Sequence, residues 1–223
     1  MYSHCPKCAD EINNEKKADT EKEARARIEK NRRNSGIPGR FKSVKISDYA
    51  PVINEAAQAK EVCVNYAKNI ESSLVTGASL VMCGKVGTGK THLACAIGNH
   101  VLSLGKTVCY TNTYRAVARV KDTYRKGSDI SETQAIEGFI GFDLLILDEI
   151  GIQYGSDAEK IILYQIINGR HESMKSTIAI SNLTSDELMG YIGEPCLDRL
   201  SGGDGGIITF TWGSYRQKTI MQK

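Results

Sequence analysis

Eight consecutive residues, Gly84 to Thr91, combine glycines with a lysine and a threonine in an order that suits phosphate binding. They match the pattern G-x4-G-K-[ST] without exception. Glycines allow a tight turn whose backbone N–H groups point at phosphate oxygens. Lys90 supplies charge for the β- and γ-phosphates, and the Thr91 hydroxyl is a magnesium ligand. The predicted ligands of ATP are Gly84, Val86, Gly87, Thr88, Gly89, Lys90, Thr91 and His92.

An apolar strand that ends in two acids supplies the second half of the predicted site. Leu144–Leu147 are all apolar, and Asp148 and Glu149 follow directly. Open α/β sheets bind ligands at the carboxyl ends of their strands. Asp148 is expected to hold magnesium through water, and Glu149 to orient or deprotonate an attacking water. Because the second acid favours attack by water, the pair predicts an ATPase rather than a kinase.

The elements around these motifs alternate between strand and helix. Continuous apolar strands that alternate with helices predict an α/β fold, with one parallel sheet covered by helices on both faces. The predicted strands are 79–83, 107–111, 144–147, 177–181 and 207–211. The predicted helices are 52–70, 90–104, 113–126 and 158–171.

The first 46 residues differ in composition from the rest. Residues 1–45 contain 12 Lys and Arg against 7 Asp and Glu, whereas the remainder contains 17 against 19. Residues 10–33 favour a helix but offer little apolar surface to pack on a body. We therefore predict a basic, helical, partner-binding arm in residues 1–46, followed by an ATPase domain in residues 47–223.

The cysteines divide into one spaced pair and five single residues. Cys5 and Cys8 form a Cys-x-x-Cys, which resembles half of a zinc ribbon, but a structural zinc site needs four ligands. The pair leaves zinc open, as either a shared site or an unmetallated remnant. The other five cysteines are expected to be buried hydrophobes in a reducing compartment. No signal peptide or membrane span is evident, which favours the cytoplasm.

Further segments resemble the AAA+ ATPases of the bacterial DnaC type, the loaders of the replicative helicase, including phage and prophage versions. The resemblance runs from about Asn31 to Arg216. Beyond the phosphate loop it rests on Ser35-Gly-Ile-Pro38, Lys121-Asp-Thr-Tyr-Arg125, Leu147-Asp-Glu-Ile-Gly151, Asp198-Arg-Leu200 and Trp212-Gly-Ser-Tyr-Arg216.

This resemblance implies roles for three further residues. Asn182 occupies the position of the polar sensor that contacts the γ-phosphate and the attacking water. Arg199 matches the arginine finger that completes the site of a neighbouring subunit, so the resemblance implies a ring or spiral of subunits. Arg216 is a weaker candidate for a second sensor. The chain after Arg199 is too short for the separate helical lid of many AAA+ proteins.

The predicted helix 113–126 interleaves aromatic and basic residues. This pattern suits single-stranded DNA, whose backbone is neutralised by cations while a base stacks on tyrosine. The resemblance places this helix in the central channel, with Lys121, Tyr124 and Arg125 as DNA contacts. The alternative is an ordinary amphipathic helix with Val117 and Val120 buried and its charges solvated.

These observations predict an ATP-dependent protein that loads a hexameric replicative helicase onto single-stranded DNA, with hydrolysis driving release. One alternative is an IstB-type transposition helper, which shares the ATPase core but has a transposase as its partner. Another is a nucleotide-gated binding protein with negligible turnover.

Overall fold

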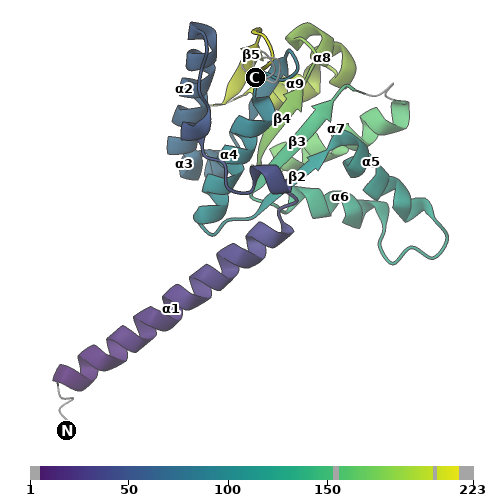
Figure 1. The fold of residues 1–223 in the computed structure, drawn as a ribbon. Coiled ribbons are helices and arrows are strands. Elements are labelled where there is room, and N and C mark those ends of the chain that lie inside the picture. Colours follow the sequence, from purple (N-terminus) through teal and green to yellow (C-terminus); the bar gives the residue numbers. More distant parts are fainter. Residues whose placement is uncertain (1–5, 153–155, 203–204, 216–223) are drawn as a thin grey trace.

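The computed structural model describes residues 6–152, 156–202 and 205–215, with side chains from residue 19 onward (Figure 1). Its strands pair in parallel to form one sheet in the order β2-β3-β4-β1-β5. Each of the five predicted strands is present, and β3 continues through the two acids to Ile150. The strands are β1 (Leu80–Gly84), β2 (Val108–Asn112), β3 (Leu144–Ile150), β4 (Ser176–Ser181) and β5 (Gly206–Phe210).

Helices cover both faces of this sheet, as the alternating pattern predicts. Leu80 and Met82 of β1 belong to a core shared with α2 and α4, whereas Val81 and Cys83 belong to a second core with α5, α6, α7, α8 and α9. Successive strand side chains therefore alternate between two buried layers. The helices are α1 (Pro6–Asn34), α2 (Asn54–Lys68), α3 (Ile70–Thr76), α4 (Lys90–Ser103), α5 (Thr113–Lys121), α6 (Glu132–Ile140), α7 (Asp157–Glu172), α8 (Ser185–Ile192) and α9 (Glu194–Ser201), with 3-10 turns η1 (Gly39–Phe41), η2 (Ile46–Asp48) and η3 (Asp122–Tyr124).

The strand order predicts a ligand-binding crevice outside the carboxyl ends of the neighbouring strands β1 and β4. After β1 the chain enters α4 on one face of the sheet, whereas after β4 it enters α8 on the other face. Neighbouring strands whose connections leave in opposite directions mark the ligand-binding crevice of an open α/β sheet. Both predicted motifs meet there, because the phosphate loop follows β1 and the acidic pair ends β3, on the other side of β4.

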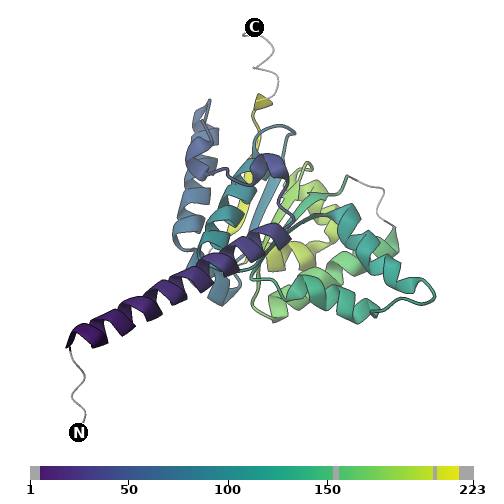
Figure 2. The same cartoon turned by 60° about the horizontal axis from the view of Figure 1, so that its bottom comes forward.

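The predicted arm is a long helix that projects from the body (Figures 1 and 2). Within the part of α1 whose side chains are described, the last turns touch the body: Asn31 Nδ2 donates to the carbonyls of Gly105 (3.2 Å) and Lys106 (3.1 Å). Directly after it, Ser35 and Ile37 are buried. The expectation of an arm without packing is therefore wrong for its C-terminal end, because a polar side chain anchors it without an apolar surface.

Two predicted helix boundaries are wrong. The helix predicted over 113–126 ends at Lys121 and continues only as the 3-10 turn η3, where the Thr123 hydroxyl donates to the Val120 carbonyl (2.7 Å). The helix predicted over 52–70 is α2, which begins at Asn54 and is followed by α3 after a break at Asn69. The short helices α3, α6, α8 and α9 were not predicted.

The five single cysteines carry free thiols, and four of them are buried, as predicted. Cys109 is only partly exposed. Burial raises the pKa of Cys63 to about 12, which fits an inert core thiol. Within the part of the chain that the structure describes, no helix is both long and apolar enough to cross a membrane.

A buried arginine ties the ends of α6, α7 and β4 together. Arg170 is fully buried, and burial lowers its pKa to about 10. Its guanidinium donates to the last carbonyls of α6, which have no partner within that helix. Its acceptors are the carbonyls of Phe139 (2.7 Å), Ile140 (3.0 Å), Phe142 (2.9 Å) and Ser176, and the Thr177 hydroxyl (3.0 Å).

Replacing this arginine should destabilise the fold strongly. Arg170→Met keeps most of the volume but leaves the carbonyls of Phe139, Ile140 and Phe142 without their donor. We expect the free energy of unfolding to fall by about 3–5 kcal/mol, measured by urea denaturation. Arg125→Met is the control, because Arg125 is mostly exposed and pairs only with Asp122. Equal stability of both variants would contradict the role of Arg170 as a clamp.

Candidate nucleotide-binding and catalytic site

The phosphate loop joins β1 to α4 and is fixed at its start by distant strands. The Gly84 N–H donates to the Leu183 carbonyl (2.8 Å), and the Lys85 N–H donates to the Phe210 carbonyl (2.8 Å). Gly84 has φ 114°, and a Cβ there would collide with the Phe210 backbone. Glycine is therefore required at this position for both its conformation and the close approach of β5.

Lys90 lies inside the loop that it follows. Its side chain is 4% exposed, and its ammonium donates to the carbonyls of Gly84 (2.5 Å) and Lys85 (2.7 Å). Burial lowers the pKa of Lys90 to about 8, although the charge of Asp148 opposes this shift. At the start of α4, Gly89 offers no side-chain cap. The free N–H groups of this first turn and the buried ammonium fit a phosphate group.

Thr91 and Asp148 meet as the sequence predicts. The Thr91 hydroxyl donates to Asp148 Oδ2 (2.9 Å), and the hydroxyl of Tyr110, from β2, donates to the same oxygen (2.8 Å). Burial, followed by the charge of Asp148, raises the pKa of Tyr110, which keeps the phenol protonated as a donor. A hydroxyl and a carboxylate at one strand edge are hard oxygen ligands of the kind that Mg2+ prefers.

Glu149 is held by an asparagine that the sequence analysis missed. Asn112 Nδ2 donates to Glu149 Oε2 (2.9 Å), while Asn112 Oδ1 accepts from the Arg115 N–H (2.9 Å) and caps α5. Glu149 is exposed and has φ 61°, an uncommon conformation for a residue with a Cβ. Asn112 lies opposite Asp148 in the pairing of β2 with β3. In the sequence, the one signal for its role was its position at the end of β2.

These residues surround a cavity of about 440 Å³. Asn182 lines it together with both acids, the phosphate loop and His92, so the structure brings most predicted site residues together. Arg216 lies outside the described residues. Arg199 does not line this cavity: it sits in α9, where Nη1 donates to the Pro195 carbonyl (3.1 Å) and the guanidinium stands 5.5 Å from the Tyr164 ring.

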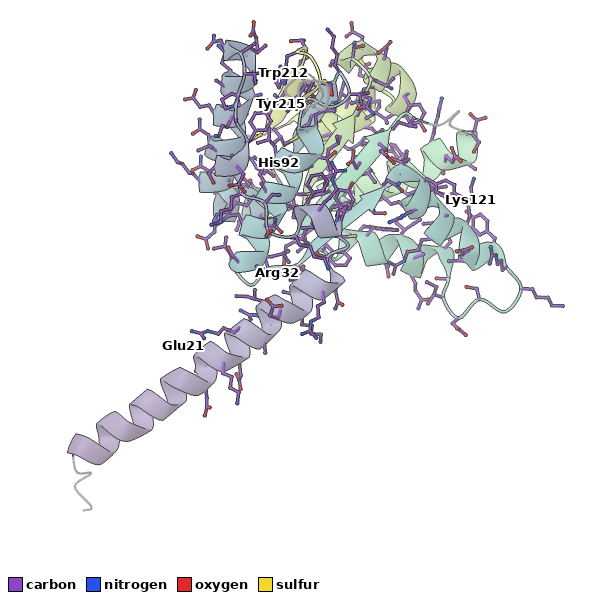
Figure 3. All side chains as sticks on the ribbon, viewed as in Figure 1. Glu21, Arg32, His92, Lys121, Trp212 and Tyr215 are labelled. Carbon is purple, nitrogen blue, oxygen red and sulfur yellow. The ribbon has the colours of Figure 1, made fainter. Side chains whose placement is uncertain are left out.

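Three aromatic residues, Tyr49, Trp212 and Tyr215, pack against one side of the phosphate loop. The Tyr49 hydroxyl (2.9 Å) and Trp212 Nε1 (3.3 Å) both donate to the Thr88 carbonyl. The Tyr215 N–H donates to the Gly87 carbonyl (2.9 Å), and its ring lies 5.3 Å from that of Tyr49. Figure 3 shows Trp212, Tyr215 and His92 on the same side of the body. The sequence analysis missed Tyr49, whose contact spans 39 positions.

None of the candidate DNA contacts lines this cavity, and Figure 3 shows Lys121 on the other side of the body from His92. Lys121 Nζ is 3.5 Å from Glu159 Oε1, and Arg125 is 3.0 Å from Asp122 Oδ1. The Tyr124 side chain is 58% exposed. Acidic partners thus offset part of the positive charge, while the aromatic ring stays accessible. Val117 and Val120 are buried, as in the amphipathic alternative.

The Cys-x-x-Cys pair is not described: Cys5 lies outside the described residues, and Cys8 lies in the part of α1 without described side chains. Among the described residues, no group of three or more His, Cys, Asp or Glu side chains could hold a metal ion.

Comparison with known proteins places the chain in a family. The model of the family described as "IstB-like ATP binding protein" matches residues 15–222. The chain belongs to this family. The replicative helicase loader DnaC of Buchnera aphidicola subsp. Baizongia pistaciae is 38% identical over 160 residues, 72% of this chain. The replicative helicase loader DnaC of Escherichia coli (strain K12) is 33% identical over 199 residues, 89% of this chain.

Family membership confirms the predicted ATPase class. The chain spans 62% of the length of the Buchnera relative and 80% of the Escherichia coli relative. The fold matches the crystal structure of the DnaC helicase loader with a TM-score of 0.68 at 22% identity, over 78% of this chain and 99% of that one. It also matches AMPPCP-bound DnaA from Aquifex aeolicus with a TM-score of 0.65 at 22% identity, over 84% of this chain and 55% of that one. The fold is therefore that of an AAA+ domain, as predicted.

The lowered pKa of Lys90 predicts a pH dependence of nucleotide affinity. Bound phosphates favour the charged ammonium, so above the free-state pKa of about 8 binding must take up a proton. Affinity for Mg-ADP should therefore be nearly constant below pH 8 and fall about tenfold between pH 7 and pH 9. Calorimetry at these pH values measures the change.

Lys90→Arg provides the control for this measurement. Arginine keeps its charge throughout this range, so the variant should bind Mg-ADP with an affinity that does not change with pH, even if it binds more weakly. If the affinity of the arginine variant for Mg-ADP also falls tenfold between pH 7 and pH 9, a group other than Lys90 titrates.

Proposed function

We propose that this chain is an ATP-dependent DNA replication protein that loads the hexameric replicative helicase onto single-stranded DNA. The observation that carries this proposal is the match to relatives named replicative helicase loader DnaC over 72% to 89% of the chain. The assembled nucleotide site supports it, since a loader must bind ATP before hydrolysis can release its cargo. The proposed location is the cytoplasm.

Within this function, the loop Gly84–Thr91 binds the phosphates, and Lys90 neutralises them. Thr91 and Asp148 would hold Mg2+, which neutralises charge on the phosphates when it is bound. Glu149 orients or deprotonates the attacking water, and Asn182 contacts the γ-phosphate. Asn112 positions Glu149, because its amide is the donor that reaches the carboxylate in the described structure.

We assign Arg199 the role of an arginine finger, which completes the ATPase site of a neighbouring subunit. Its position in α9, away from the chain's own cavity, supports a role across an interface. Its guanidinium lies beside the Tyr164 ring on α7, and the exposed side chains of Tyr164 (42%) and Ile161 (56%) on that helix offer apolar surface for a second copy. Hydrolysis would then depend on assembly, which distinguishes this proposal from a nucleotide-gated binding protein with negligible turnover.

This assignment predicts complementation between two inactive variants. Arg199→Ala should bind ATP normally but lose at least about 100-fold in turnover, because its neighbours lack the finger. Glu149→Gln should bind ATP and fail to hydrolyse it in its own site. A mixture of the two should regain activity, since each Glu149→Gln subunit supplies a finger to an intact Arg199→Ala site. Steady-state phosphate release measures this recovery.

Two outcomes would contradict the finger. Normal hydrolysis by Arg199→Ala alone would show that no finger is needed at this position. A mixture that stays inactive, although both variants associate, would show that Arg199 serves its own subunit.

We also propose that Lys121, Tyr124 and Arg125 contact single-stranded DNA. The exposed Tyr124 ring can stack a base, and the two cations can exchange their carboxylate partners for phosphates. Arg216 remains a candidate second sensor, and a zinc site at Cys5 and Cys8 is not part of this proposal.

We assign helicase binding to the arm, because residues 1–46 carry the excess positive charge and α1 projects from the body (Figure 2). Native mass spectrometry of the chain with its host's replicative helicase hexamer and ATP tests this function. A complex that requires residues 1–34 is the expected result. No complex with the full chain would overturn the loader function and favour the transposition helper, with the ATPase class unaffected.

A further inference from the structure

A second cavity of about 640 Å³ lies at the base of the arm, on the outer side of α4. It is bounded by the end of α1, the segment between η1 and η2, the last turns of α2, and the second half of α4. Its apolar lining comes from Val44, Ile46, Val64, Ala67 and Ala96. No nucleotide-site residue lines it, so this groove is a separate surface.

The charged residues that line this groove are all basic. They are Arg32, Lys42, Lys45, Lys68 and, when protonated, His100. No Asp or Glu lines it, but two carboxylates lie beside lining residues: Glu29 Oε1 is 3.8 Å from Arg32 Nη1, and Asp48 Oδ2 accepts from the Lys45 N–H (2.8 Å). Figure 3 places Arg32 where α1 meets the body. An apolar groove with a basic rim is complementary to an acidic ligand that carries an apolar side chain.

The groove walls also contain unsatisfied polar atoms. Of the three buried side-chain polar atoms without a partner among the described residues, two belong to groove residues: Arg32 Nε and Asn99 Oδ1. The orientation of Asn99 is fixed, because its Nδ2 donates to the carbonyls of Phe41 (2.8 Å) and Val44 (3.0 Å). Both atoms are buried, so the ligand contacts that the groove offers are those to its basic rim and its apolar lining.

The chain's own ends do not suit this groove. Residues 216–223 carry three cations and no acid, so the rim would repel them. Residues 1–5 precede α1 in the sequence, and α1 has 29 residues, so its first residue is about 43 Å from the end that borders the groove. Nucleic acid is disfavoured, because no Phe, Tyr or Trp lines the groove to stack a base and the floor of the groove is apolar.

We propose that this groove binds an acidic segment of the partner helicase, with one apolar side chain seated between α2 and α4. The identity of the partner rests on the loader function proposed above. The groove then provides a second contact beside the arm, so that α1 and the groove hold neighbouring parts of one partner.

The test measures the affinity of full-length variants for the helicase hexamer with ATP. Lys42→Glu/Lys68→Glu reverses two rim charges, and Lys126→Glu/Lys160→Glu makes the same charge change away from the groove. Val64→Gln makes the apolar lining polar, and Val62→Gln is its control, because Val62 lies on the same helix but is 40% exposed. Unchanged thermal melting and ATP affinity confirm that each variant is folded.

The expected result is an affinity loss of about tenfold or more for both groove variants and less than about twofold for both controls. Wild-type affinity of both groove variants would overturn the groove and leave the loader function intact. No binding by the unmodified chain would overturn both proposals. Groove variants that keep the helicase but lose a fluorescent oligo-dT strand would overturn the groove as a protein site and assign it to nucleic acid.

Discussion

The site depends on one constraint of the sheet: all five strands are parallel, so their carboxyl ends meet at a single edge. The phosphate loop follows β1 and Asp148 ends β3, with β4 between them. The hydrogen bond from Thr91 to Asp148 spans that intervening strand and joins two motifs that are 57 positions apart. Asn182, directly after β4, lines the same cavity. A slip of β3 by one residue would turn Asp148 to the opposite face and remove this bond.

The two halves of the site are held to different degrees. The loop is bonded from Leu183 after β4, from β5, from Tyr49 and from the chain after β5, through contacts to Gly84, Lys85, Gly87 and Thr88. Such a loop meets a phosphate without reorganising, which favours binding. Glu149 is exposed and is restrained by one amide from Asn112. With the proposed roles, binding and turnover would rest on separate contacts, so a variant is expected to lose one and keep the other.

The sequence predicts what is local. The phosphate loop, the acid pair and the five strands are patterns within a few consecutive residues, and they are found as expected. Tyr110 and Asn112 were missed because their roles depend on β2 lying beside β3, which no local pattern states. Arg170 was missed for the same reason, since its partners come from two other elements. The role proposed for Arg199 involves a second subunit; the resemblance and the position of Arg199 away from its own chain's cavity support it.

Helix α4 connects the nucleotide site to the groove at the base of the arm. Its first residue, Lys90, lies among the phosphate-loop carbonyls, and Asn99, which lines the groove, follows about 14 Å along the same helix. A helix transmits a displacement of its first turn to its last. If nucleotide and a partner segment in the groove each bind one position of α4 better than another, nucleotide binding and partner binding are coupled. Linkage then requires the coupling to be reciprocal: the factor by which ATP strengthens partner binding equals the factor by which the partner strengthens ATP binding.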